Sequence, residues 1–151
     1  MIRFLIATHG YLADGFKSAL GVIIGEEISS KIATLNLYIE DNPESSDAKT
    51  QIEQFFSTVA EDDQVVVFTD ITHGSVNQLM LPYVDDQRVF VITGVNLPLL
   101  CEVITLLGCG NRIACSDVLR EAAFQAQKQI IFVNELLKEQ PAQDDDECFF
   151  E

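Results

Sequence analysis

Residues 1–10 have the sequence MIRFLIATHG, and the rest of the chain can be interpreted outward from this stretch. The run from Ile2 to Ala7 is apolar except for Arg3, which is typical of a strand buried on both faces. Apolar residues at helical spacing follow, with Gly25 as a suitable stop: Ala13, Phe16, Leu20, Ile23 and Ile24. A buried strand followed by a helix puts His9 at the carboxyl end of a parallel sheet, where open α/β folds carry their sites.

The composition limits the classes of protein that the chain can belong to. With 151 residues, of which 48% are hydrophobic, the chain is expected to form a single domain with a full core. The formal net charge of −15 argues against nucleic acid or an anionic membrane as a partner and favours a basic protein surface. The first apolar run is too short to span a membrane and lacks the marks of a signal peptide, so we expect a cytoplasmic protein.

The cysteines and histidines do not indicate a metal site. The four cysteines show no C-x-x-C spacing, and the chain has only two histidines to join them as ligands. We therefore expect no metal, and we expect the thiols to be free packing residues rather than nucleophiles: Cys101, Cys109, Cys115 and Cys148.

Three further strand–helix units follow the first. Strands are predicted over 31–38, 65–68 and 88–93, and of these 65–68 has the strongest strand signal. A helix capped by Ser46 or Asp47 is predicted to run to about Val59, and a second one to be bent or shortened by Pro82. A third is expected from about Pro98 to Gly108 or Gly110, and a fourth from a cap at Ser116 or Asp117 to Lys128.

Repeated strand–helix units predict a doubly wound α/β fold of the flavodoxin-like type, with a four-stranded, mainly parallel sheet and helices on both faces. Residues 130–133 (Ile-Ile-Phe-Val) are ambiguous, because so short an apolar run could continue the last helix or form an extra strand. Residues 140–151 are strongly acidic and are predicted to be a flexible tail. The predicted domain therefore covers residues 1–139.

Three polar residues are expected at the carboxyl edge of the sheet: His9, Asp70 and Asn96. A carboxylate that accepts a hydrogen bond from one imidazole nitrogen fixes the tautomer and leaves the other nitrogen as a nucleophile. Gly74 and Ser75 stand at a predicted helix start, where backbone N–H groups and a hydroxyl can hold phosphoryl oxygens. The alternative for this pair is an ordinary turn with a helix cap.

Three motifs at these strand ends resemble a known family. They are Thr8-His9-Gly10, Phe68-Thr69-Asp70 with Gly74-Ser75 and Asn77, and residues 92–98 (ITGVNLP). In order, and over residues 1 to about 135, they resemble the mannose/fructose-class enzyme IIA of the bacterial sugar phosphotransferase system.

This resemblance implies a phosphocarrier without a cofactor. His9 would accept a phosphoryl group from the histidine of HPr and pass it to enzyme IIB, with Asp70 orienting the imidazole. Gly10, Gly74 and Ser75 would bind the phosphoryl group. The chain would reach a membrane transporter only through IIB, and it would form a homodimer in which a C-terminal strand, matched by Ile130–Val133, is exchanged.

The sequence departs from the family in the loop after Asp70. The family loop usually reads D-x-x-G-G-[ST]-P-x-N, whereas residues 70–77 lack the proline and are one residue shorter. The loop also contains a second histidine, His73, which could donate to phosphate or be an exposed loop residue. Asn77 and Asn96 are further candidates for the site.

Other functions stay open at this point. The nearest is the phosphocarrier domain of a dihydroxyacetone kinase system, which passes its phosphoryl group to a kinase. Another is a regulatory module that has lost transfer activity, for which the altered loop after Asp70 is the only indication. An aspartyl-phosphate receiver domain would need an acidic cluster after the first strand, where this chain has Thr8-His9-Gly10.

Overall fold

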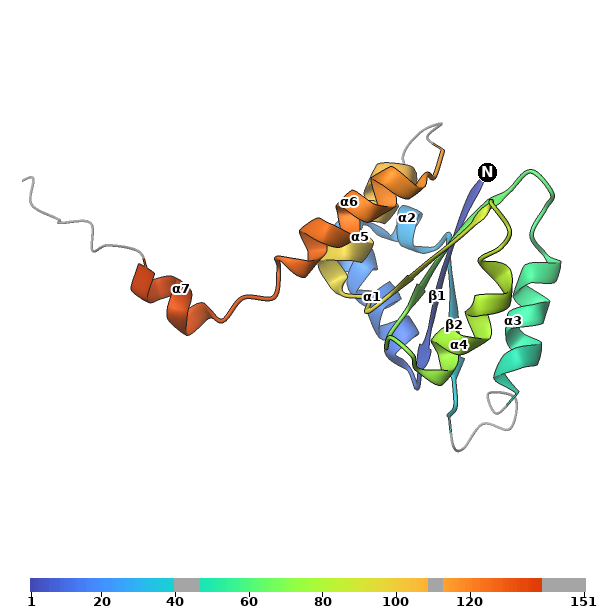
Figure 1. Ribbon diagram of the computed structural model, residues 1–151, viewed down its shortest axis with the longest axis horizontal. Helices are drawn as coiled ribbons and strands as arrows, with labels where there is room; N and C mark the ends of the chain where they lie inside the picture. Colours follow the sequence, from blue (N-terminus) through green and yellow to red (C-terminus); the bar gives the residue numbers. More distant parts are fainter. Residues whose placement is uncertain (40–46, 109–112, 140–151) are drawn as a thin grey trace, which may run out of the picture.

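A computed structural model describes residues 1–39, 47–108 and 113–139 of the chain. Its centre is a four-stranded parallel sheet in the order β2-β1-β3-β4 (Figure 1). The strands are β1 (Ile2–His9), β2 (Ile32–Leu37), β3 (Gln64–Thr69) and β4 (Val89–Thr93). The predicted parallel sheet of four strands is thereby confirmed.

The two inner strands are the most completely buried. Phe4 to Thr8 of β1 and Val65 to Thr69 of β3 are buried at every position. A strand in the middle of a parallel sheet is covered by helices on both faces, so it carries no alternation of polar residues. The outer strands β2 and β4 are buried less completely.

Helices cover both faces of the sheet. One face carries α1 (Leu12–Ile24), α5 (Leu97–Gly108) and α6 (Ser116–Gln127), with the short α2 (Glu26–Ser29) beside α1. The other carries α3 (Ala48–Ser57) and α4 (Ser75–Met80), the latter followed by a 3-10 turn (Leu81–Tyr83) that contains Pro82. The doubly wound arrangement is therefore confirmed, including the shortened helix at Pro82.

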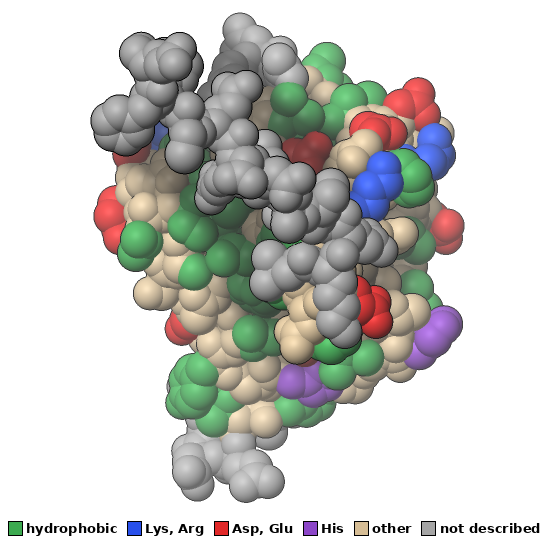
Figure 2. All heavy atoms as spheres, turned by 90° about the vertical axis from the view of Figure 1, so that its left-hand side faces the viewer, with side chains coloured by type: hydrophobic (Ala, Val, Ile, Leu, Met, Phe, Trp, Pro, Cys, Tyr) green, Lys and Arg blue, Asp and Glu red, His purple; other side chains and the backbone are tan. Residues whose placement is uncertain are grey.

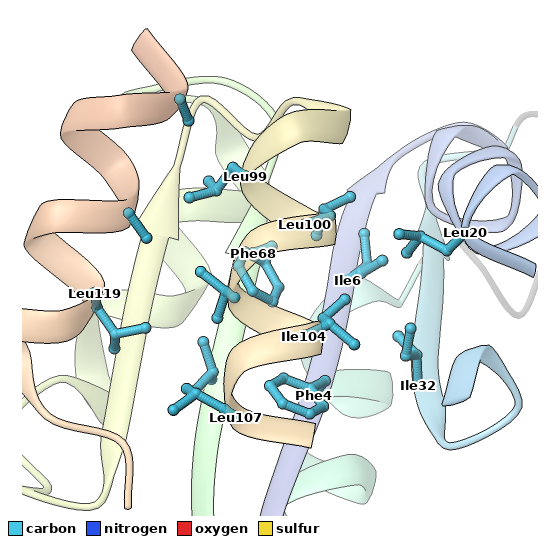
Figure 3. Close-up of a cluster of buried hydrophobic side chains, with 14 of the residues drawn as sticks. Phe4, Ile6, Leu20, Ile32, Phe68, Leu99, Leu100, Ile104, Leu107 and Leu119 are labelled. Atoms are coloured by element: carbon cyan, nitrogen blue, oxygen red, sulfur yellow. The ribbon is translucent and has the colours of Figure 1, made fainter. Parts of the chain in front are cut away.

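Side chains of alternate strand residues enter two separate cores. Phe4 and Ile6 of β1 pack with Phe68 of β3 against Leu100 and Ile104 of α5 (Figure 3). The neighbouring positions point the other way and contact α3 and α4: Leu5, Ala7, Val65 and Val67. Because His9 continues the odd-numbered series of β1, its side chain lies on the face that α4 covers.

Most predicted helix ends agree with the structure, but one cap was wrong. Gly25 ends α1 with φ 93°, and the Asp47 side chain accepts a hydrogen bond from the N–H of Thr50 at the start of α3. Helix α6 starts after Cys115, whose side chain makes no capping hydrogen bond. Ser116 and Asp117, the predicted caps, lie inside the first turn, because the extended residue that precedes the helix is Cys115.

Residues 130–133 do not continue α6, so that alternative was wrong. Helix α6 ends at Gln127, and residues 130–132 are neither helix nor strand before α7 (Val133–Glu139) begins. All four side chains are exposed, and Figure 1 shows α7 lying away from the sheet. The predicted acidic tail, 140–151, lies outside the described residues, as do Gly110, Cys109 and Cys148. None of the described helices has the length and apolar character needed to cross a membrane.

Candidate functional site

The candidate site lies at the carboxyl edge of the sheet, between β1 and β3. From β1 the chain passes through α1 to β2 on one side, and β3 then pairs with β1 on its other side. Open α/β folds bind their ligands at the carboxyl ends of the two strands where the strand order reverses in this way. His9, the last residue of β1, and Asp70, the first residue after β3, lie at this point.

Asp70 holds His9 through both its ring and its backbone. Oδ2 of Asp70 lies 2.8 Å from Nδ1 of His9 and also accepts a hydrogen bond of 2.8 Å from the N–H of His9. Oδ1 accepts a third, from the N–H of Ile71 at 2.8 Å. The Asp70 side chain is only 7% exposed, so these donors take the place of water around its charge.

The same contacts keep Asp70 ionised. Burial by itself would raise the pKa of Asp70, but the hydrogen bonds from the backbone and ring of His9 and from Ile71 outweigh it and hold that pKa below its usual value. An ionised carboxylate only accepts hydrogen bonds, so Nδ1 of His9 carries the proton. The lone pair of the imidazole is then on Nε2.

Ser75 lies beside this second nitrogen. Its Oγ is 2.9 Å from Nε2 of His9, and with the lone pair on Nε2 the serine hydroxyl is the donor. The His9 side chain is 37% exposed, so a molecule from solution can approach Nε2. The arrangement provides a nucleophile with a fixed tautomer and a hydroxyl directly beside it.

The two glycines of the site act through their backbones. Gly10 has φ 57° and its N–H donates to the carbonyl of Leu37 at 2.8 Å, while the N–H of Gly74 donates to the carbonyl of Ile71 at 3.0 Å. A Cβ on Gly74 would lie 3.1 Å from the Ile71 oxygen and 3.5 Å from Cε1 of His9. The tight contact would therefore be with the loop's own backbone, while the distance to the imidazole is an ordinary van der Waals contact. Both glycine N–H groups already donate to backbone carbonyls.

The hydrogen bonds of the other candidates from the sequence lie elsewhere than at His9. Asn96 accepts a hydrogen bond from the N–H of Leu99 and donates to the carbonyl of Ala126, so it caps α5 and links it to α6. Asn77 accepts from the hydroxyl of Thr69 and holds α4 against the end of β3. His73 is exposed with φ 63°, and Figure 2 shows the two histidines as separate purple patches near one end of the molecule.

Tyr38 is a site residue that the sequence analysis missed. Its ring stacks on the imidazole of His9 with the centroids 5.4 Å apart and an angle of 23° between the planes. It was assigned to the strand 31–38, whereas β2 ends at Leu37 and Tyr38 has φ 59°. The available signal was its position just after a strand that ends at the same edge of the sheet as β1.

The described part of the chain contains no group of three His, Cys, Asp or Glu side chains arranged to hold a metal ion. Of the cysteines in this part, Cys101 is half-buried and Cys115 is exposed, and both are free. Burial raises the pKa of the Cys101 thiol, which keeps it protonated and poorly nucleophilic.

Fold and site together define a class of protein: a doubly wound α/β domain with a carboxylate-held histidine at the carboxyl edge of its sheet. The sequence model of the EIIA-man family, the fructose IIA component of the PTS system, matches residues 3–121. The chain therefore belongs to this family of the sugar phosphotransferase system.

Individual relatives agree with this assignment. The chain is 26% identical over 139 residues to the PTS system fructose-specific EIIA component of Bacillus subtilis (strain 168), covering 91% of this chain and 90% of the relative. A solved structure of a candidate phosphoenolpyruvate-dependent sugar phosphotransferase system permease from Klebsiella pneumoniae superposes with a TM-score of 0.78 at 26% identity, covering 90% and 93% of the two chains. The structure of the PTS IIA protein associated with the fucose utilization operon of Streptococcus pneumoniae superposes with a TM-score of 0.67 at 26% identity, covering 90% of this chain and 96% of the other.

Components IIA of this system transfer phosphoryl groups, so the chain is a phosphotransferase component. Because the chain belongs to this family, it is not an aspartyl-phosphate receiver domain, which was one of the alternatives from the sequence.

Proposed function

We propose that the chain is a phosphocarrier in which Nε2 of His9 accepts a phosphoryl group from phosphorylated HPr and passes it to enzyme IIB. The observation that carries this proposal is the Asp70 contact at Nδ1, 2.8 Å long, which leaves Nε2 of the partly exposed His9 side chain as the nucleophile. Because this chain has a net charge of −15, we expect HPr and IIB to contact it through basic surfaces. The reaction would take place in the cytoplasm, and contact with a membrane transporter would be made through IIB.

In the proposed step, the lone pair of Nε2 forms a bond to phosphorus while the bond between phosphorus and the donor histidine breaks. The His9 ring then carries a positive charge, because Nδ1 keeps its proton. Asp70 stabilises this cation, and it is already ionised and in place before the reaction. Ser75 can turn its hydroxyl from Nε2 to a phosphoryl oxygen. Gly10 contributes the left-handed turn after His9, and Gly74 the close turn of the loop before Ser75.

The active form proposed is a homodimer. Ile130 to Val133 are between 52% and 84% exposed in the single chain, which is a large apolar surface for one short segment. Strand β4 is at the sheet edge, and a hollow beside it is lined by Phe90 and Ile92 from the strand and by Leu119 and Ala123 from α6. Residues 130–133 of a second copy, paired with the β4 edge, would cover both apolar surfaces.

Labelling with phosphoenolpyruvate, enzyme I and HPr tests the assignment of His9. We expect an acid-labile, base-stable label on the wild-type chain and none on His9→Gln, because the glutamine has no nucleophilic nitrogen. His73→Gln is the matched control, since it removes the other histidine, and it should label like the wild type. Label retained on His9→Gln, or lost from His73→Gln, would contradict the assignment.

The same labelled protein identifies the acceptor. Discharge of the label by enzyme IIB is expected for the proposed function. Discharge only by a dihydroxyacetone kinase would favour the alternative phosphocarrier. A folded wild-type chain that takes up no label would favour a regulatory module.

A further inference from the structure

The His9 ring is contacted both at its nitrogens and on its face. Asp70 lies at Nδ1 and Ser75 at Nε2, so hydrogen bonds hold two atoms on the edge of the ring. Tyr38 is stacked against the ring, with the centroids 5.4 Å apart and 23° between the planes. This contact opposes movement of the imidazole out of its plane, so it adds to the positioning by the two hydrogen bonds.

The backbone of Tyr38 is held in an unfavourable conformation to reach this position. Leu37 pairs with His9 in the β1–β2 register, and its carbonyl accepts the N–H of Gly10 at 2.8 Å. Tyr38 then turns with φ 59°, a left-handed conformation that is costly for a bulky side chain. Such conformations persist where the surroundings determine them, and they are concentrated at functional sites.

The ring of Tyr38 also interacts favourably with a positive charge on His9. The face of an aromatic ring carries negative charge and attracts a cation placed over it. A His9 ring that carries a phosphoryl group on Nε2 and a proton on Nδ1 is cationic. Stacking on Tyr38 therefore stabilises the phosphorylated ring more than the neutral one.

We propose that Tyr38 is a positioning residue for His9, and that it slows the loss of the phosphoryl group to water. This inference rests on the phosphocarrier function proposed above. In the hydrolysis that it opposes, a water oxygen bonds to phosphorus while the P–Nε2 bond breaks and leaves its electron pair on Nε2. Both protons of the water leave with the phosphate, as H2PO4⁻, and the ring returns to its neutral form with its own proton still on Nδ1.

The lifetime of the phosphohistidine on the isolated chain tests this effect. The chain is labelled, separated from enzyme I and HPr, and followed by the loss of label in buffer. Tyr38→Asn removes the ring but suits the left-handed backbone, because asparagine tolerates positive φ. We expect it to lose label about 3- to 10-fold faster than the wild type, the effect of one aromatic contact with a charged ring.

Two further variants make the result specific. Tyr38→Phe keeps the ring and should stay within about two-fold of the wild-type lifetime, since one aromatic face replaces another. Tyr11→Ala removes another exposed tyrosine from the segment after β1 and should behave as the wild type. A wild-type lifetime in Tyr38→Asn, or an equally short lifetime in Tyr38→Phe, would overturn the proposal.

Proton NMR of the unphosphorylated chain tests the positioning separately. The carbon-bound ring protons of His9 should be shifted by the stacked aromatic ring in the wild type and in Tyr38→Phe, and should lose that shift in Tyr38→Asn. His73, the other histidine, provides an internal reference. Unchanged His9 signals in Tyr38→Asn would overturn the positioning role. Absence of label from the wild type would instead overturn the phosphocarrier function, while the NMR comparison still decides the role of Tyr38.

Discussion

Asp70 combines burial with three hydrogen-bond donors, and this combination determines how its charge depends on pH. Because its pKa in the folded chain is held below the usual value, folding favours the ionised form. The resulting stabilisation is complete above the pKa of the unfolded chain, and it is lost as the pH falls through the lowered folded pKa. Asp70 therefore keeps its charge, and its hold on His9, throughout the neutral range.

Replacement of this carboxylate tests its part in the chemistry. Asp70→Asn has nearly the same shape but no charge, so it cannot stabilise a cationic ring and no longer enforces the proton on Nδ1. We expect phosphoryl transfer from HPr to slow by about 10²-fold or more. Rapid-quench measurement of the transfer rate checks this, with Asp117→Asn as the control because Asp117 forms only an exposed pair with Arg120. Transfer at the wild-type rate in Asp70→Asn would show that the carboxylate is a bystander.

The sequence was informative about His9, Asp70 and Ser75 because each lies directly at a strand or helix end that its apolar neighbours reveal. It was less informative about Asn96, since membership of the same sheet edge does not say where a side chain points. Tyr38 was missed for a related reason: its contact with His9 depends on a positive φ that an apolar pattern does not encode.

Helices α5 and α6 are joined by a polar link that is separate from the site. The Asn96 side chain accepts a hydrogen bond of 3.0 Å from the N–H of Leu99 and donates one of 3.2 Å to the carbonyl of Ala126. It thus satisfies one free donor at the start of α5, and it adds a second hydrogen bond to a carbonyl near the end of α6 that also accepts from the N–H of Gln129. Asn96 is at the predicted edge of the sheet, but its hydrogen bonds serve packing.

The substitution Asn96→Ala distinguishes a role in helix packing from a role in phosphoryl transfer. We expect the free energy of unfolding to fall by about 1–2 kcal/mol, because a capping contact and a partly buried hydrogen bond are lost. Phosphoryl transfer should be unchanged. Urea unfolding and the labelling assay check the two expectations, with Asn134→Ala in the exposed α7 as the control. Slower phosphoryl transfer at an unchanged free energy of unfolding would contradict this expectation and show that Asn96 takes part in the site.

Secondary structure was predictable where periodicity ran over several turns or where a strand was apolar throughout. The start of α6 was not, because Cys115, Ser116 and Asp117 follow one another, and the backbone conformation alone decides which of them precedes the helix. Residues 130–133 were ambiguous for a similar reason, since four apolar residues do not distinguish a helical period from a strand period. The short α2 carried no separate signal beyond the end of α1.

The single chain leaves an apolar segment in water, and this leads to a prediction about assembly. Phe132, at 64% exposure, lies within the segment 130–133 that we place in the dimer interface. Phe132→Asp would bury a charge in that interface, so we expect monomers or insoluble protein where the wild type gives dimers. Size-exclusion chromatography with light scattering at micromolar concentration measures this.

Val22→Asp is the matched control for this experiment. Val22 is 86% exposed on α1, so the substitution also adds a charge to an exposed apolar position, and the dimer should persist. A wild-type chain that is a stable monomer at micromolar concentration would contradict the exchanged segment.

The architecture itself was the most predictable property, because four strand–helix units of similar length permit few arrangements. Assembly could be inferred only from the exposed apolar segment and the family resemblance, since one chain contains no contact with a second.

The contact between His9 and Asp70 also has a consequence for folding. The two residues are 61 positions apart in the chain, and they meet only when β3 has paired with β1. Contacts of such long sequence separation form late, because the entropy of closing the intervening loop must be overcome first. A nascent chain in which only β1, α1 and β2 have formed therefore carries an unconstrained imidazole. The tautomer that distinguishes Nε2 from Nδ1 arises together with the closure of the sheet, so the site matures with the native topology and not before it.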